Sequence, residues 1–152
     1  MIGSLNYLAC QTRYDICFAI SKLSKYLMNP SPQHIKAARR IMQYLKGSKF
    51  LSVVFSGDLD GHEAMKLYTF FDASYASDLT TLKSHSGSLH KLAGGVITAT
   101  SKQQTIVAQS SIEAEYYAGA KNAMESAYIR QVLEELGYRG NDIKCIETYG
   151  DN

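Results

Sequence analysis

Acidic residues at three places in this 152-residue chain have the types and positions that suit metal-ion chemistry. Asp72 ends the aromatic run at 66–74, and Asp151 is the second-last residue. Glu113 and Glu115 lie near the start of a long helical pattern. If the first and last strands of this part are parallel neighbours, the acids meet at the edge of the sheet where both strands end. Clustered carboxylates repel one another unless cations intervene, so the pattern indicates Mg²⁺ or Mn²⁺. The alternative is a set of acids that are only solvated.

Charge divides the chain into two parts. Residues 1–50 carry eight Lys or Arg and one acid, a net charge of +7, whereas residues 51–152 carry eight bases and thirteen acids, a net charge of −5. A basic part beside an acidic part is typical of a protein that binds a polyanion with one and a divalent cation with the other. Two solvated surfaces would give the same division.

Composition excludes several classes of protein. With 45% hydrophobic and 20% charged residues and two prolines, the chain is not a disordered or collagen-like segment. No apolar run reaches the roughly 18 residues of a membrane-spanning helix, and no signal peptide is recognised, so no membrane contact is expected. The length predicts one core with an appendage.

Two helices are predicted in the basic part. Apolar residues spaced by three and four predict a helix over 12–28, with Thr12 and Asp15 as a capping box. Ser31 and Pro32 fit the N-cap and first position of a second helix that runs to about Lys46. Its apolar stripe faces away from four basic residues, which form a positive arc: Lys36, Arg39, Arg40 and Lys46.

The acidic part predicts strands and one long helix. Strands are expected at 66–74, 86–92 and 95–100, the last two joined by a tight turn at Ala93-Gly94, so that the three form a meander. A helix follows at 111–136, closed by Gly137. The segment 142–151 is the last strand candidate. This order predicts an α/β fold with a mixed sheet.

Several separated strings resemble one known family. The strings F-D-A-S-Y-A-S (71–77), S-H-S-G-S-L-H-K-L-A-G-G-V-I-T (84–98) and S-K-Q-Q-T-I-V-A-Q-S-S-I-E-A-E-Y-Y-A (101–118) resemble the ribonuclease H region of copia-type retrotransposon Pol polyproteins. The strings I-G-S-L-N-Y-L-A, T-R-Y-D-I-C-F-A-I-S and A-A-R-R-I-M-Q-Y-L-K-G resemble the segment that joins that region to the reverse transcriptase. The match covers essentially the whole chain.

The resemblance assigns roles to particular residues. It implies that Asp72, Glu115 and Asp151 are the catalytic and metal-binding acids. Residues two apart point to different sides of a helix, so only one of Glu113 and Glu115 can face the site, and the family pattern favours Glu115. Nucleic-acid contacts are expected at the two serines at the helix start, at Asn122 on the same helix face as Glu115, and at the positive arc, namely Ser110, Ser111, Asn122, Lys36, Arg39, Arg40 and Lys46. As alternatives, the two serines only cap the helix, and the arc only solvates its helix or faces the polymerase.

The family likeness also implies an activity. It implies a ribonuclease H-like domain at 49–152, incomplete at its C-terminus, after a helical connection segment at 1–48. The expected enzyme is a hydrolase that cleaves the RNA strand of RNA–DNA hybrids with two Mg²⁺ ions, Mn²⁺ being a substitute. Its expected partner is the reverse transcriptase of the same polyprotein, in cytoplasmic virus-like particles and the nucleus.

Departures from the family pattern leave alternatives open. Ser74 and Tyr75 stand where the family usually has Asp and Trp, and Ala99 stands where another Trp is common. The end of the family domain, with its final acid, is expected beyond Asn152. A catalytically silent remnant that only binds nucleic acid or has a structural role is therefore the alternative. A transposase or integrase is disfavoured by the basic N-terminal helices and the E-A-E-Y string.

Overall fold

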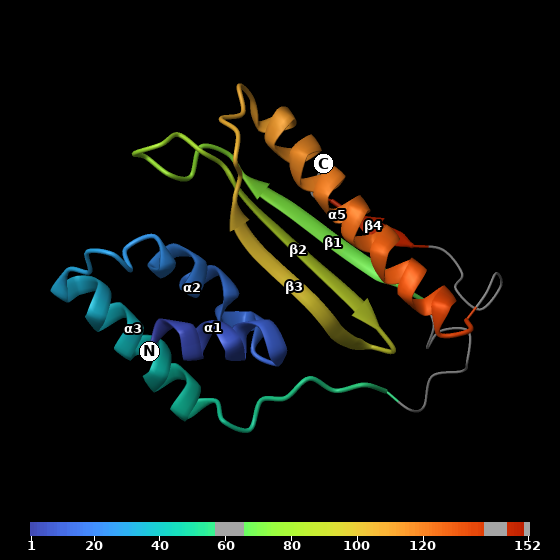
Figure 1. The fold of residues 1–152 in the computed structure, drawn as a ribbon, viewed down its shortest axis with the longest axis horizontal. Helices are drawn as coiled ribbons and strands as arrows, with labels where there is room; N and C mark the ends of the chain where they lie inside the picture. The colour runs from blue at the N-terminus through green and yellow to red at the C-terminus, as the bar shows by residue number, and fades with distance from the viewer. Residues whose placement is uncertain (57–65, 139–145, 151–152) are drawn as a thin grey trace. The chain divides into compact units, whose positions relative to one another are not determined.

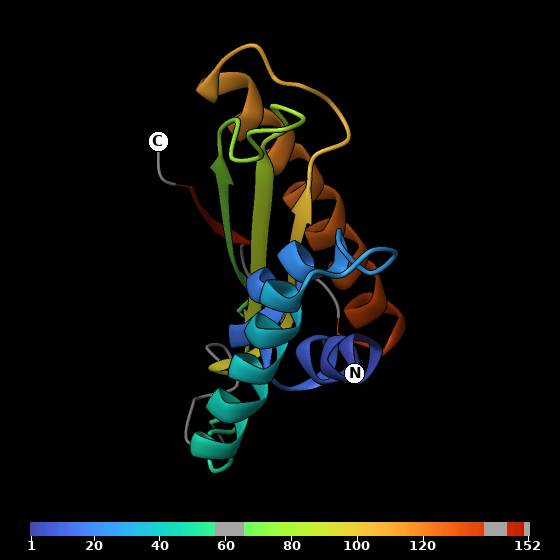
Figure 2. The same cartoon turned by 90° about the vertical axis from the view of Figure 1, so that its left-hand side faces the viewer.

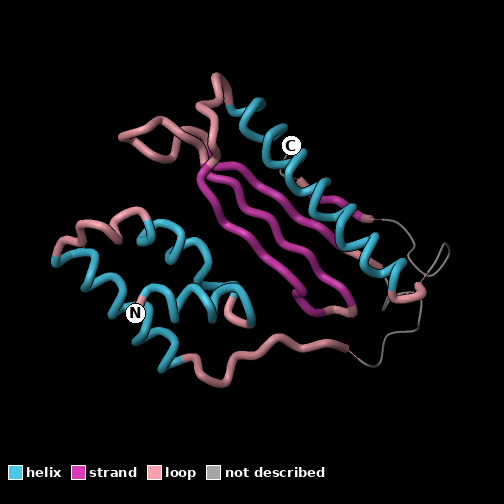
Figure 3. Tube along the Cα trace, viewed as in Figure 1, coloured by secondary structure: helices cyan, strands magenta, loops and turns pink. Residues whose placement is uncertain are grey.

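Two units of different architecture make up the chain. In the computed structural model, which describes residues 1–56, 66–138 and 146–150, the contacts separate Met1–Val53 from Val54–Asn152. The first unit is helical and the second is built on a sheet (Figure 1). Colouring by secondary structure shows the same division (Figure 3). None of the helices in the described part of the chain has the length and apolar character needed to cross a bilayer.

The first unit packs α1 (Ile2–Gln11), the 3-10 turn η1 (Tyr14–Ile16), α2 (Cys17–Ser24) and α3 (Pro32–Gly47) around a small apolar core. The buried core residues are Leu5, Ala9, Ile16, Ile20 and Ile41. The predicted helix at 32–46 is confirmed, with Ser31 as N-cap and Pro32 at its start. The Ser31 N–H donates to Nδ1 of His34 at 3.1 Å, which satisfies a backbone donor at the helix start.

The prediction of a helix over 12–28 is wrong at both ends. Thr12 ends α1 instead of starting the next helix, and α2 runs only from Cys17 to Ser24. Arg13 donates to both carboxylate oxygens of Asp15, at 3.0 and 2.7 Å. Residues two apart do not face each other on an α-helix, so this bidentate pair favours the tighter turn found at 14–16.

The second unit is a four-stranded mixed sheet with one long helix. The strands are β1 (Tyr68–Ser74), β2 (His85–Leu92), β3 (Gly95–Gln103) and β4 (Glu147–Tyr149), in the order β3-β2-β1-β4. β1, β2 and β3 form the predicted antiparallel meander, and β4 is parallel to β1. Residues Ala93 and Gly94, with φ of 50° and 76°, make the predicted tight turn. The mixed α/β class is confirmed; residues 142–145 and 151 of the last predicted strand lie outside the described residues.

The helix α5 (Ser111–Glu135) lies along one face of the sheet (Figure 2). Its buried side carries small or polar residues at every fourth position: Ala114, Ala118, Asn122 and Ser126. Small side chains let the helix backbone approach the strands closely, and their polar members pair with strand residues. The predicted span of 111–136 is confirmed, and Gly137, with φ of 98°, follows the last turn.

Candidate active site

Pairing along β1 leaves part of its edge open at the strand's carboxyl end. β4 pairs with Tyr68, Thr69 and Phe70, and its described residues do not pair farther along β1. An ion pair between Lys66 and Glu147 holds the start of β4 beside β1, and it lowers the pKa of the Glu147 carboxyl. Among the described residues, no strand pairs with residues 71–74 on this side of β1.

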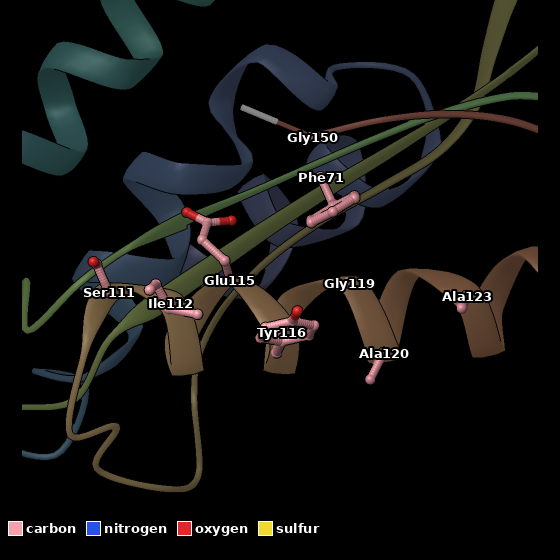
Figure 4. A pocket seen from close by; sticks show the side chains of 9 residues that line it. All are labelled: Phe71, Ser111, Ile112, Glu115, Tyr116, Gly119, Ala120, Ala123 and Gly150. Atoms are coloured by element: carbon pink, nitrogen blue, oxygen red, sulfur yellow. The ribbon is translucent and has the colours of Figure 1, made fainter. Parts of the chain in front are cut away.

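Glu115 reaches this edge from α5. Its Oε1 accepts a hydrogen bond at 3.2 Å from the backbone N–H of Ala73, the residue directly after Asp72. Figure 4 shows the carboxylate extending from the helix toward the strands. Asp72 is exposed, and the alternation of a strand puts its side chain on the opposite face from Phe71, which faces α5. Glu115 therefore approaches β1 from the α5 side, and Asp72 precedes the residue that it contacts but points to the other face of the sheet.

Glu113 caps the N-terminal end of α5 and does not reach the β1 edge. Its Oε2 accepts from the backbone N–H of Gln109 at 2.7 Å, while its own N–H donates to Oγ of Ser110 at 3.1 Å. These reciprocal bonds satisfy free N–H groups at the start of α5. Glu113 is therefore a capping residue, and of the two glutamates it is Glu115 that lies at the β1 edge. Ser110 likewise serves as a cap in this structure.

A groove runs along α5 beside the Glu115 carboxylate. It measures about 820 Å³ and is open to solvent. Its lining residues come from α5, β1 and the end of β4: Phe71, Ser111, Ile112, Glu115, Tyr116, Gly119, Ala120, Ala123 and Gly150. Ser111 is the predicted nucleic-acid contact that lies in this groove. Gly119 also lies in the groove, on the helix face where the sequence predicts small residues that admit a nucleic-acid backbone. Phe71 and Gly150 carry no chemical group that a sequence pattern could single out, so the prediction missed them.

Asn122 is not where the sequence prediction requires it. The residue is 1% exposed, under the helix, and its Nδ2 donates to Oγ1 of Thr69 at 3.1 Å. The prediction assigned it to the same helix face as Glu115. Both residues do lie on nearly the same face of α5, because residues seven apart differ by only about 20° around a helix axis, but they are about 10 Å apart along it. Glu115 reaches the β1 edge, whereas Asn122 faces Thr69 inside the sheet. Asn122 therefore joins α5 to β1 and presents no surface to nucleic acid.

The remaining predicted site residues belong to the first unit or lie outside the described residues. Asp151 directly follows Gly150 but is not among the described residues. Within the described segments, no group of three or more His, Cys, Asp or Glu side chains could hold a metal ion. The basic residues of the positive arc are all exposed on α3 of the first unit: Lys36, Arg39, Arg40 and Lys46.

Comparisons with known proteins give relatives for almost the whole chain. The chain is 38% identical over 136 residues to the retrovirus-related Pol polyprotein from transposon TNT 1-94 of Nicotiana tabacum, covering 90% of this chain and 10% of that protein. It is 35% identical over 139 residues to the corresponding polyprotein from transposon RE1 of Arabidopsis thaliana, covering 91% and 9%. The chain thus spans about a tenth of the length of these curated relatives.

A third relative has nearly the length of this chain. The secreted RxLR effector protein 161 of Plasmopara viticola is 34% identical over 128 residues, which cover 84% of this chain and 87% of that protein. Neither a family model nor a solved structure matches the chain.

Proposed function

We propose that the second unit is a metal-dependent nuclease module with a ribonuclease H-like fold. The proposal starts from the family: the chain belongs to the retrovirus-related Pol polyproteins of copia-type plant transposons. The proposed substrate is the RNA strand of an RNA–DNA hybrid. The proposed partners are other portions of the same polyprotein, the reverse transcriptase among them.

One contact carries this proposal. The hydrogen bond from the Ala73 N–H to Glu115 brings a helix carboxylate to the residue that follows Asp72, near the end of β1, although the two acids are 43 positions apart in the sequence. β4 runs parallel to β1, and Asp151 follows it in the sequence, two residues after Tyr149, outside the described residues. A mixed sheet with acids at the ends of parallel strands is a common setting for ligand binding.

The donor atoms at this edge fit a hard cation. Asp72, Glu115 and Asp151 would supply carboxylate oxygens, which Mg²⁺ and Mn²⁺ prefer over nitrogen or sulfur ligands. When bound, two such ions lower the pKa of a water molecule and stabilise the leaving oxygen of a phosphodiester. The Ala73 N–H holds Glu115 in place for this task, and the exposed Asp72 carboxylate remains accessible to a cation.

Recognition of the hybrid would use different surfaces for different parts of the substrate. The groove along α5 begins at Ser111, near the helix start, where backbone N–H groups favour phosphate oxygens. Discrimination of RNA from DNA requires contacts with 2′-hydroxyl groups in a wide minor groove. The exposed basic arc of α3 would add phosphate contacts that are independent of sequence.

The test is cleavage of a labelled RNA–DNA hybrid in Mg²⁺. We expect Asp72→Asn and Glu115→Gln each to reduce cleavage to the metal-free background while the circular dichroism spectrum stays unchanged. Glu113→Gln is the matched control, because the amide oxygen still accepts from the Gln109 N–H and the charge removed lies two residues from Glu115. Cleavage at the parent rate by both Asp72→Asn and Glu115→Gln would refute the site assignment.

A catalytically silent segment is the second candidate. The relative from Plasmopara viticola favours it, because this chain covers 87% of that protein, which its name describes as a secreted effector. On this alternative the chain binds a hybrid but does not cleave it at any Mg²⁺ or Mn²⁺ concentration. A binding titration and the cleavage assay on the same preparation separate the two candidates.

A further inference from the structure

The side chain directly before Asp72 lies between two glycines. Phe71 comes from β1, Gly119 from α5 and Gly150 from the residue after β4, and Figure 4 shows the ring between the two glycine positions. A Cβ atom placed on Gly119 would lie 3.2 Å from Cε2 of the ring. A Cβ atom placed on Gly150 would lie 2.6 Å from Cζ and 3.0 Å from Cε1.

These distances mean that the ring separates two backbones at contact distance. Carbon atoms at optimal separation are about 3.5 to 4.0 Å apart, so a methyl group on Gly150 would overlap the ring and one on Gly119 would be tightly compressed. Both glycines therefore allow α5 and the chain after β4 to approach β1 as closely as one aromatic ring permits. A flat, rigid side chain fixes such a spacing better than a flexible one.

Each of the three residues is next to a proposed catalytic acid. Phe71 precedes Asp72, Gly150 precedes Asp151, and Gly119 lies one helical turn after Glu115 on the same side of α5. We propose that Phe71 is a positioning residue whose ring sets the spacing of the three backbone segments that carry the acids. The inference rests on the proposed function for what the spacing serves, but the spacing itself can be measured without any activity.

The hydrogen bond between Ala73 and Glu115 reports on this spacing. It joins β1 to α5 at 3.2 Å, close to the upper limit for such a bond, so a small displacement of the helix or of the strand end weakens it. A weaker bond raises the rate at which the Ala73 amide proton exchanges with solvent. Exchange at this amide therefore measures how well the ring holds Glu115 at the β1 edge.

The experiment compares amide exchange by NMR in the full chain. We expect Gly150→Ala to accelerate exchange of the Ala73 amide about tenfold, with little change at the amides shared by β2 and β3. Gly87→Ala is the control, because its Cβ meets only the carbonyl oxygen of Thr100 at 4.0 Å and should leave the Ala73 rate unchanged. A Gly150→Ala variant with the parent rate at Ala73 would overturn the proposal.

A double variant separates positioning from general destabilisation. Leucine lacks the Cε and Cζ atoms that the added methyl group meets, so Phe71→Leu combined with Gly150→Ala should restore most of the protection at Ala73. Protection that is lost in Gly150→Ala and not recovered in the double variant would also overturn the proposal, because the loss would then not come from contact with the ring.

Cleavage assays then link the spacing to function. If the parent cleaves hybrids, Gly150→Ala should raise the Mg²⁺ concentration needed for half-maximal rate and leave KM for the hybrid unchanged. The double variant should reverse that increase. A parent that does not cleave hybrids would refute the proposed function but leave the exchange results, and hence the spacer, standing.

Discussion

Polar side chains fill much of the space between α5 and the sheet. Oγ of Ser126 and Nε2 of His90 lie 3.1 Å apart, and Asn122 donates to Thr69. His90 is fully buried. This burial lowers the pKa of its imidazole, and Glu125 offsets part of the effect. The side chain is therefore held neutral where a solvated histidine begins to bind a proton.

His90 should make the stability of the second unit depend on pH. Because its folded pKa lies below the ordinary value of 6.5, the unfolded chain binds more protons as the pH falls through that value. The stabilisation is complete above 6.5 and decreases at lower pH. We expect a smaller free energy of unfolding at about pH 5.5 than at about pH 7.5 in urea titrations.

A variant without a titrating ring isolates this effect. His90→Gln retains a polar group for Ser126 and should reduce the difference in unfolding free energy between the two pH values, although the variant is less stable overall. An unchanged difference would assign the pH dependence to other groups.

Helix ends show how far local sequence signals determine structure in this chain. The N-caps Ser31 and Ser110 stand where the helices α3 and α5 begin, because each signal is satisfied within its own turn. The similar signal at Thr12 predicted a helix start wrongly, because the Asp15 side chain is used elsewhere. It pairs with Arg13 and accepts a hydrogen bond at 2.7 Å from Tyr44, which is 29 positions away in the sequence. The contact with Tyr44 cannot be predicted from the spacing of neighbouring residues.

Ser110 gives a test at the scale of one helix. Its Oγ accepts from the Glu113 N–H at 3.1 Å. Ser110→Ala should therefore lower the free energy of unfolding by about 1 kcal/mol. Denaturant titration measures this change, and Ser111→Ala is the matched comparison, with an expected loss near zero. If Ser110→Ala weakened hybrid binding without any loss of stability, phosphate contact and not capping would be its main task.

The candidate site was predictable in part. Asp72 and the pair Glu113 and Glu115 could be selected from an order of elements that puts acids at one sheet edge. The choice of Glu115 came from the family pattern, and the structure brings it to the residue after Asp72. Asn122 could not be placed, because its helical spacing does not reveal which side of α5 packs on the sheet. The packing of Phe71 between Gly119 and Gly150 depends on distances between three backbone segments, and the spacing of residues in the sequence does not predict such distances. The assignment of Asp151 and of residues 1–48 as a connection segment stays a prediction.

The whole molecule combines two units of opposite charge. The first carries eight bases and one acid, and the second carries eight bases and thirteen acids. A nucleic acid bound to the chain should therefore owe its salt dependence mainly to the first unit, whose four arc residues on α3 are exposed.

Replacing residues of the positive arc tests whether the first unit causes most of the salt dependence of binding. Changing Lys36, Arg39 and Arg40 together to Gln should weaken hybrid binding most at low salt, and should reduce the slope of log affinity against log salt by up to about 3. Changing Lys83, Lys91 and Lys102 together to Gln removes the same number of charges from the second unit and serves as the control. Equal slopes for the triple variant and the parent would rule out phosphate contacts at the arc.

The most direct test of the central claim is a titration of the isotopically labelled chain with Mn²⁺, followed by NMR. Paramagnetic broadening falls steeply with distance from the ion, so it locates the cation without relying on turnover. The account predicts that the amides of Asp72, Ala73 and Glu115 broaden first in the parent and in Glu113→Gln, and that Glu115→Gln removes this effect. Broadening that starts elsewhere, or that persists unchanged at Asp72 and Ala73 in Glu115→Gln, would contradict a metal site at the end of β1.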